Sequence, residues 1–138
     1  MAAPARHVAL PGPRGSASEP VTVTIGPAGR WAVLVAVSGE VDLSSAGQLT
    51  VHLAEAVATP DVLAVVLDLT GVRFLAASGL TALVRTLEAA EAAAVELHLV
   101  ADQRAVLRPL QVTGLRERFC VHPDADAALA RYASANSR

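Results

Sequence analysis

The sequence predicts an α/β protein with a mixed sheet, an opening β-hairpin and helices packed mainly on one face of the sheet. Its 138 residues suit a single core, expected over residues 21–134. Hydrophobic residues make up 53% of the chain but only 3% are aromatic, so Val, Leu and Ala must fill that core. After a hairpin, strand-like and helical patterns alternate, which implies parallel strands joined by right-handed crossovers.

The chain is expected to begin with a flexible tail followed by the hairpin. Residues 1–20 are rich in Pro, Gly and Ser and carry no periodic apolar pattern. Residues 21–25 alternate Val or Ile with Thr, residues 26–29 supply turn residues, and residues 31–37 form a second β-type run. Gly39 is predicted to end this second strand.

A helix and a central strand follow the hairpin. The helix is predicted after Asp42, because Leu49 and Leu53 recur on one face, and Ser45 with Gln48 fits a capping box. Residues 62–69 are short, apolar and rich in Val. This composition is typical of a central strand covered by helices.

The second half of the sequence repeats the alternation of helix and strand. The predicted elements are a helix from Ser78, a strand at 95–100, a helix at 103–112 that Pro109 kinks or restarts and Gly114 ends, a strand at 119–121 and a helix at 124–132. Cys120 falls in an apolar run and is expected to be buried. A single cysteine cannot form an internal disulfide, which favours a reducing, cytoplasmic location.

Composition argues against nucleic-acid and membrane partners. The net charge is −2 and no basic stripe is present, whereas binding to phosphate backbones requires one. No apolar stretch approaches the roughly 20 residues of a membrane span. Common nucleotide-binding loops are also missing, so no cofactor is expected.

No metal site is expected either. The histidines are His7, His52, His98 and His122. They form no His-x₃-His pair and show no cysteine partner spacing typical of zinc ligands. Isolated histidines of this kind are usually surface or half-buried residues.

Evidence for an enzyme is weak. Ser78 precedes Gly79 where a strand passes into a helix, but the flanking glycines of a nucleophile elbow are missing. Asp42, Asp68 and Asp102 stand near strand ends, where α/β proteins often bind ligands. Aspartates at such positions more commonly cap a helix or fix a turn, so catalysis is not predicted.

Three stretches carry a family pattern. They are SGEVDLSSA at 38–46, VLDL through FLAASGL at 66–80, and LQVTGL at 110–115. Together they resemble the STAS domain of bacterial anti-sigma factor antagonists over about residues 21–132, with the spacing between motifs kept. The resemblance implies a STAS-like sheet that agrees with the predicted order of elements.

The resemblance also implies a function by partner switching. A family member docks on an anti-sigma factor of the serine-kinase type, which has a histidine-kinase-like ATPase fold, and the sigma factor is released. The partner then phosphorylates the antagonist on a Ser or Thr that follows an Asp. Here Ala76 and Ala77 occupy those two positions. The protein therefore lacks the usual off-switch, or Ser78 accepts the phosphate, or the site is a fixed binding surface; Ser78 could also simply cap its helix.

The partner-binding surface implied by the resemblance combines the first loop with the start of the second helix. Its residues are Asp42, Leu43, Ser44, Leu75, Ala76, Ala77, Ser78, Gly79, Leu80 and Thr81, with Arg85 beside them. The alternative function is a non-catalytic scaffold subunit of a larger signalling assembly. A weak homodimer is left open.

Overall fold

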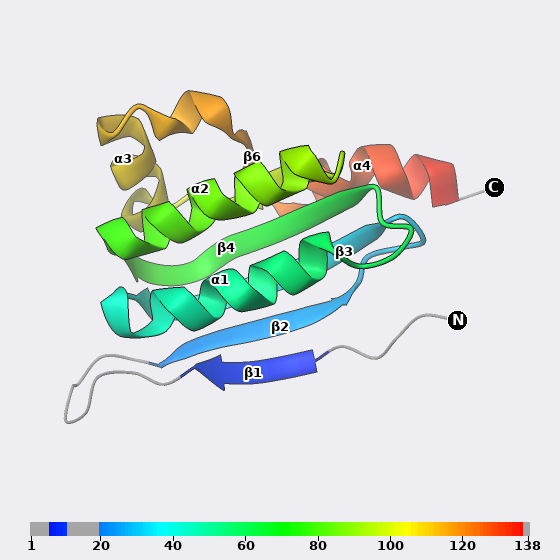
Figure 1. Cartoon of the computed structure of the whole chain (residues 1–138). Helices are drawn as coiled ribbons and strands as arrows, with labels where there is room; N and C mark the ends of the chain where they lie inside the picture. The colour runs from blue at the N-terminus through cyan, green and yellow to red at the C-terminus, as the bar shows by residue number, and fades with distance from the viewer. Residues whose placement is uncertain (1–5, 11–19, 137–138) are drawn as a thin grey trace.

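The computed structural model describes residues 6–10 and 20–136, which form a mixed sheet and its covering helices (Figure 1). The elements are β1 (Arg6–Leu10), β2 (Val21–Pro27), β3 (Ala32–Val41), α1 (Leu43–Val57), β4 (Ala64–Leu75), α2 (Ala77–Ala92), β5 (Glu96–Val100), α3 (Arg104–Val112), the 3₁₀ helix η1 (Leu115–Arg118), β6 (Cys120–His122) and α4 (Ala125–Asn136).

Each strand lies beside the next strand in sequence, in the order β1-β2-β3-β4-β5-β6. The pairs β1–β2 and β2–β3 are antiparallel, and the pairs from β3 to β6 are parallel. The predicted mixed sheet with an opening hairpin is confirmed. Crossovers through helices join the parallel strands.

Strand β1 lies within the segment expected to be a flexible tail. It pairs with β2 from Arg6 opposite Ile25 to Leu10 opposite Val21, so that expectation is wrong for residues 6–10. The strand is stabilised by pairing with a distant segment, which local composition does not reveal. Residues 1–5 and 11–19 of the expected tail lie outside the described residues.

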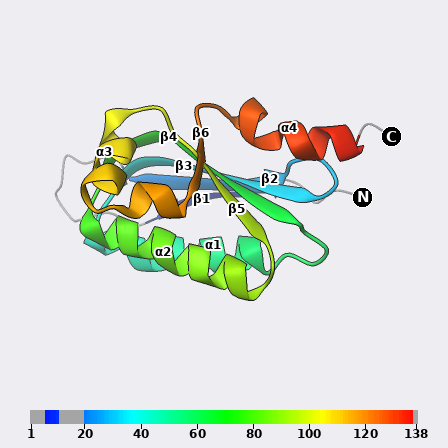
Figure 2. The same ribbon diagram turned by 90° about the horizontal axis from the view of Figure 1, so that it is seen from above.

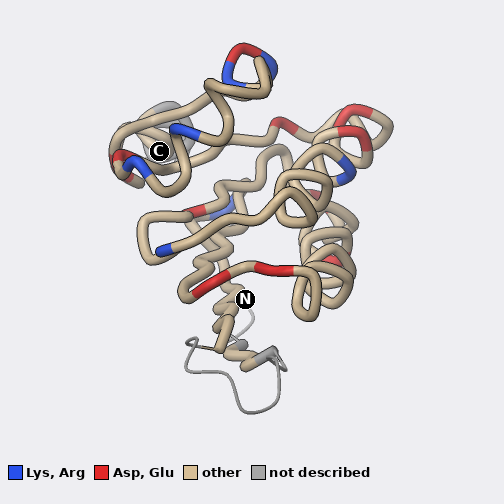
Figure 3. Tube along the Cα trace, turned by 90° about the vertical axis from the view of Figure 1, so that its left-hand side faces the viewer, with Lys and Arg blue, Asp and Glu red and all other residues tan. Residues whose placement is uncertain are grey.

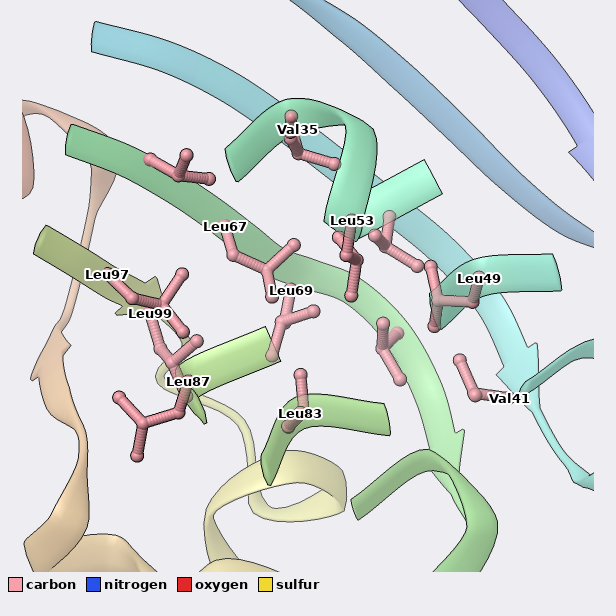
Figure 4. Close-up of a cluster of buried hydrophobic side chains, with 14 of the residues drawn as sticks. Val35, Val41, Leu49, Leu53, Leu67, Leu69, Leu83, Leu87, Leu97 and Leu99 are labelled. Carbon is pink, nitrogen blue, oxygen red and sulfur yellow. The ribbon is translucent and has the colours of Figure 1, made fainter. Parts of the chain in front are cut away.

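Helices α1 and α2 cover one face of the sheet and α4 lies on the opposite face (Figure 2). The alternation of β2 shows why, because Val21 and Val23 are buried on the face that α1 covers while Thr22 and Thr24 point the other way and are half-buried. Leu and Val side chains of the sheet and of both helices form the main core (Figure 4). The prediction of helices mainly on one face is confirmed.

Strand β4 is longer than the predicted 62–69 and is bulged. Its register against β3 shifts at residues 36–38 and again at 39–40 of β3, so β4 carries extra residues there. The Gln103 side-chain amide, just before α3, donates to the carbonyl oxygens of Leu69 (2.7 Å) and Val72 (2.9 Å). These bonds satisfy two carbonyl oxygens of β4 beyond Asp68, where its pairing with β5 ends.

The predicted end of β3 is wrong, whereas α1 begins after Asp42 as predicted. Strand β3 does not end at Gly39 but continues to Val41. Gly39 has φ +102°, and a Cβ there would lie 2.4 Å from the carbonyl oxygen of Pro20, so its role is a close backbone approach within the sheet. Helix α1 begins at Leu43, and its N-cap is Asp42.

The carboxyl-terminal third follows the predicted order with small corrections. Helix α3 continues through Pro109 to Val112, and Gly114 follows it in the left-handed conformation, as predicted. Cys120 is exposed rather than buried. It lies on β6, an edge strand of the sheet that the described residues form.

Charge is spread over the described part of the molecule. Figure 3 shows Arg and acidic residues scattered along the trace. Within the described residues, no helix is long and apolar enough to cross a membrane.

Candidate functional site

The start of α2 is fixed on the ends of β3 and β4. The backbone N–H of Ala76 donates to the carbonyl oxygen of Val41 at 2.9 Å, and Val41 pairs with Leu75 across the two strands. A Cβ at Gly79 would lie 2.5 Å from Leu75 Cδ1 and 2.9 Å from Val41 Cγ1. Only a glycine therefore allows α2 to approach the strand ends this closely.

Helix α1 begins beside this point with a complete cap. The Asp42 carboxylate accepts hydrogen bonds from the Ser44 N–H (3.0 Å) and the Ser44 hydroxyl (2.7 Å), and the Asp42 N–H donates to Ser45 Oγ (3.2 Å). The capping box is therefore Asp42 with Ser45, not Ser45 with Gln48 as expected. The sequence carried only part of the usual signal, because Asp42 is a preferred N-cap residue but the third position after it is Ser45 and not Glu or Gln.

The electrostatics of Asp42 follow from the cap. Donation by the Ser44 hydroxyl is the largest influence and lowers the pKa of the Asp42 carboxyl; partial burial opposes it, and the backbone N–H groups of Ser44 and Ser45 lower it further. The Asp42 carboxylate is thus kept ionised, which suits its role as the cap of α1. It is not tuned toward proton transfer.

Helix α2 begins without such a cap. Its N-cap is Ala76, which offers no side-chain acceptor, and its first helical residue is Ala77. Ser78 therefore lies inside the helix and does not cap it, contrary to one of the expectations. Its Oγ is buried and has no hydrogen-bond partner among the described residues.

A shallow groove of about 210 Å³ separates α1 from α2 beside Ser78. Small residues line it, among them Ala46, Gly47 and Ala82. Pockets for small molecules usually enclose roughly 300 Å³ or more. This groove is therefore too small and too open to favour a small-molecule site.

The ten residues expected to contact a partner divide by exposure. Leu43, Ser44, Ala77 and Thr81 are exposed, Asp42, Ala76 and Ser78 are half-buried, and Leu75, Gly79 and Leu80 are buried. The last three pack into the core beneath the first turn of α2, so their contact with a partner stays a prediction.

Phe74 is an exposed residue of this region that the sequence reasoning missed. It is 51% exposed, and it lies on β4 opposite Glu40 of β3. The apolar pair Phe74-Leu75 gave no sequence signal for which side chain points outward, because the bulges of β4 decide that. We call the exposed and half-buried set, without Ser78 because its Oγ is buried, the docking corner: Asp42, Leu43, Ser44, Phe74, Ala76, Ala77 and Thr81.

The family model for the STAS domain matches residues 20–128. This match covers most of the chain and includes every element of the docking corner. The chain belongs to the STAS domain family. The resemblance of its three motifs and the sheet order both agree with this assignment.

Solved STAS structures share the fold. An anti-sigma factor antagonist from Mycobacterium paratuberculosis is 32% identical, with a TM-score of 0.72 over 80% of this chain and 92% of that one. The antagonist SpoIIAA in its unphosphorylated form is 18% identical, with a TM-score of 0.67 over 80% of this chain and 96% of that one. Phosphorylated SpoIIAA from Bacillus is 18% identical, with a TM-score of 0.62 over 80% and 98%. A comparison with curated protein sequences gave no significant match.

Proposed function

We propose that this STAS protein is an anti-sigma factor antagonist: a non-catalytic, cytoplasmic binding module that docks on an anti-sigma factor of the serine-kinase type and so releases a sigma factor. The observation that carries the proposal is the docking corner. It offers exposed apolar side chains on a rigid frame, in a chain 32% identical to a solved antagonist.

The energetics of the docking corner favour association. Leu43 is 83% exposed and Phe74 is 51% exposed. Fully burying a side chain of this size is worth about 1.5–3 kcal/mol, and such residues surrounded by polar groups are typical of protein-binding sites. The polar surroundings are Asp42, Ser44 and Thr81.

The proposed antagonist works without phosphorylation at the usual family position. In the family pattern the acceptor hydroxyl stands where this chain has Ala77. Ser78 is a poor substitute, because its Oγ is buried beside α1 and a kinase would have to move the helix to reach it. Both observations support a docking corner whose charge stays constant.

Calorimetry can test the docking corner. It measures binding of the protein to a purified anti-sigma factor of the serine-kinase type. Leu43→Glu and Phe74→Glu are each expected to weaken the complex by roughly 30-fold or more, the effect of losing an interface hot spot of about 2 kcal/mol. Leu63→Glu is the matched control, since Leu63 is also an exposed leucine (53%) but precedes β4 at the other end of the strand. Substitutions of buried Leu75 or Leu80 would unfold the core and are unsuitable.

The proposal fails if no such anti-sigma factor binds, if Leu43→Glu and Phe74→Glu both bind as the wild type does, or if the control Leu63→Glu weakens the complex as much as they do. Addition of the wild-type protein should also restore transcription by sigma factor held in the inhibited complex. Size-exclusion chromatography of the free protein tests separately for a weak homodimer.

Incubation with the partner kinase and ATP, followed by intact mass measurement, tests the missing acceptor. The wild type is expected to keep its mass, whereas the double variant Ala76→Asp/Ala77→Ser is expected to gain one phosphoryl group. A phosphorylated wild type whose modification disappears in Ser78→Ala would contradict the proposal and make Ser78 the acceptor.

A further inference from the structure

Three potential metal ligands meet on β5 and β6, a region that the docking corner does not include. His98 Nδ1 lies 3.0 Å from His122 Nε2, and Cys120 Sγ lies 3.3 Å from the same His122 atom. All three atoms lie within 4.8 Å of one another. Imidazole nitrogen and thiolate sulfur are the ligands that zinc prefers in proteins.

The parallel pairing of the two strands explains this convergence. His98 pairs directly with Cys120, and His122 follows two residues later on the same face of β6. The sequence spacing alone therefore predicted no site, because the third ligand comes from a strand more than twenty residues earlier. The register of β5 against β6, and not a local sequence motif, brings these three residues together.

A further side chain orients the first ligand. His98 Nε2 lies 3.1 Å from Glu96 Oε1, and a carboxylate at that nitrogen favours a proton on Nε2. The Nδ1 atom, which faces Cys120 and His122, then carries the lone pair. A histidine held in this way by a carboxylate is the usual arrangement of metal-bound histidines.

We propose that His98 Nδ1, Cys120 Sγ and His122 Nε2 bind one divalent transition-metal ion of the zinc class, with Glu96 orienting His98. His98 is only 7% exposed, but Cys120 is exposed. The fourth tetrahedral position therefore faces water on the side of Cys120. Binding releases the Cys120 thiol proton to solvent and moves the His122 proton to Nδ1, so that Nε2 can donate its lone pair.

The two distances to His122 Nε2 fit such an ion after small side-chain rotations, and the third pair, His98 Nδ1 and Cys120 Sγ, lies within 4.8 Å. Zinc bonds of about 2.0–2.1 Å to nitrogen and about 2.3 Å to sulfur place tetrahedral ligand atoms about 3.3 Å (nitrogen to nitrogen) and about 3.5 Å (sulfur to nitrogen) apart. The observed 3.0 Å and 3.3 Å are slightly shorter. The ion would also join the short edge strand β6 to β5, so binding should raise the thermal midpoint.

Titration of the reduced, chelator-treated full-length protein with Co²⁺ and Zn²⁺ tests this site. One Co²⁺ per chain is expected, with the near-ultraviolet absorption of a cobalt–thiolate bond, and Zn²⁺ should displace it. Cys120→Ala should abolish that absorption and weaken Zn²⁺ binding by more than the roughly 10–100-fold expected for Glu96→Gln. His122→Ala should weaken Zn²⁺ binding by a comparable factor.

His7→Ala is the matched control, because His7 is an exposed histidine on β1; its Zn²⁺ affinity should equal that of the wild type. Cys120 is exposed, so Cys120→Ala keeps the fold and circular dichroism can verify this. Bound Co²⁺ without the thiolate absorption, or unchanged Zn²⁺ affinity and thermal midpoint in Cys120→Ala, would overturn the proposal.

Discussion

The two helices that border the docking corner begin differently, and this difference predicts opposite effects of two substitutions. Asp42 caps α1 through its carboxylate, whereas Ala76 stands at the N-cap of α2 with no side-chain acceptor. Ala76 has the extended backbone of a capping residue, with φ −74° and ψ 169°. Ala76→Asp should therefore raise the free energy of unfolding by about 1 kcal/mol, and Asp42→Ala should lower it by about 0.5–2 kcal/mol.

Urea denaturation measures both changes, and thermal unfolding should shift by roughly 4 °C for each kcal/mol in a domain of this size. Ala76→Asn is the matched control, because it supplies the same hydrogen-bond acceptor without the charge. If neither Ala76→Asp nor Ala76→Asn stabilises the protein, then the uncapped start of α2 does not limit its stability and the reasoning is wrong.

The contribution of Asp42 should also depend on pH. Its pKa is lowered in the folded protein, chiefly by the Ser44 hydroxyl. A lowered folded-state pKa means that the carboxylate stabilises the fold at all pH values above the unfolded pKa of about 3.9. The stability difference between the wild type and Asp42→Ala should hold constant at neutral pH and shrink as the pH falls below that value; a difference that grows in acid would contradict this assignment.

Three further substitutions test the frame of the docking corner by urea denaturation. Gln103→Ala removes two hydrogen bonds to the bulged strand β4 and should cost about 1–3 kcal/mol; an unchanged midpoint would mean that water replaces the amide. Gly79→Ala places a methyl group against Leu75 and Val41 and should also cost about 1–3 kcal/mol. Gly47→Ala meets nothing within 4 Å and should stabilise α1 by up to about 1 kcal/mol, so a loss there would contradict the packing described.

The order of elements from residue 21 onward was predictable because each element has a local signal. Alternation in β2, the Val-rich centre of β4 and the apolar stripe of α2 all depend on neighbours in sequence. Strand β1 has no such signal, since its Val8 is only half-buried and its stability comes from pairing with β2. Local composition does not reveal pairing between strands that lie far apart in the sequence.

The position of the candidate site in the fold was predictable, but the exposure of its individual side chains was not. The motif resemblance led to the loop before α1 and the start of α2, and both border the docking corner. Sequence could not separate exposed Phe74 from buried Leu75, because the bulges of β4 set the direction of each side chain. The convergence of His98 with Cys120 likewise depends on strand register, which no spacing along the chain encodes.

On the proposed docking surface, the alanine at position 77 has a consequence for regulation. Ala77 is exposed in the first turn of α2, so a phosphate at this position would add about −1.5 to −2 charges to the surface that also carries Leu43 and Phe74. A methyl group fixes that charge at zero, while the bond from Ala76 to Val41 and the close packing of Gly79 hold the surface in one shape. If the docking corner binds a partner as proposed, phosphorylation at position 77 cannot change its affinity, and the fraction of partner bound follows from the concentrations of the two proteins by mass action.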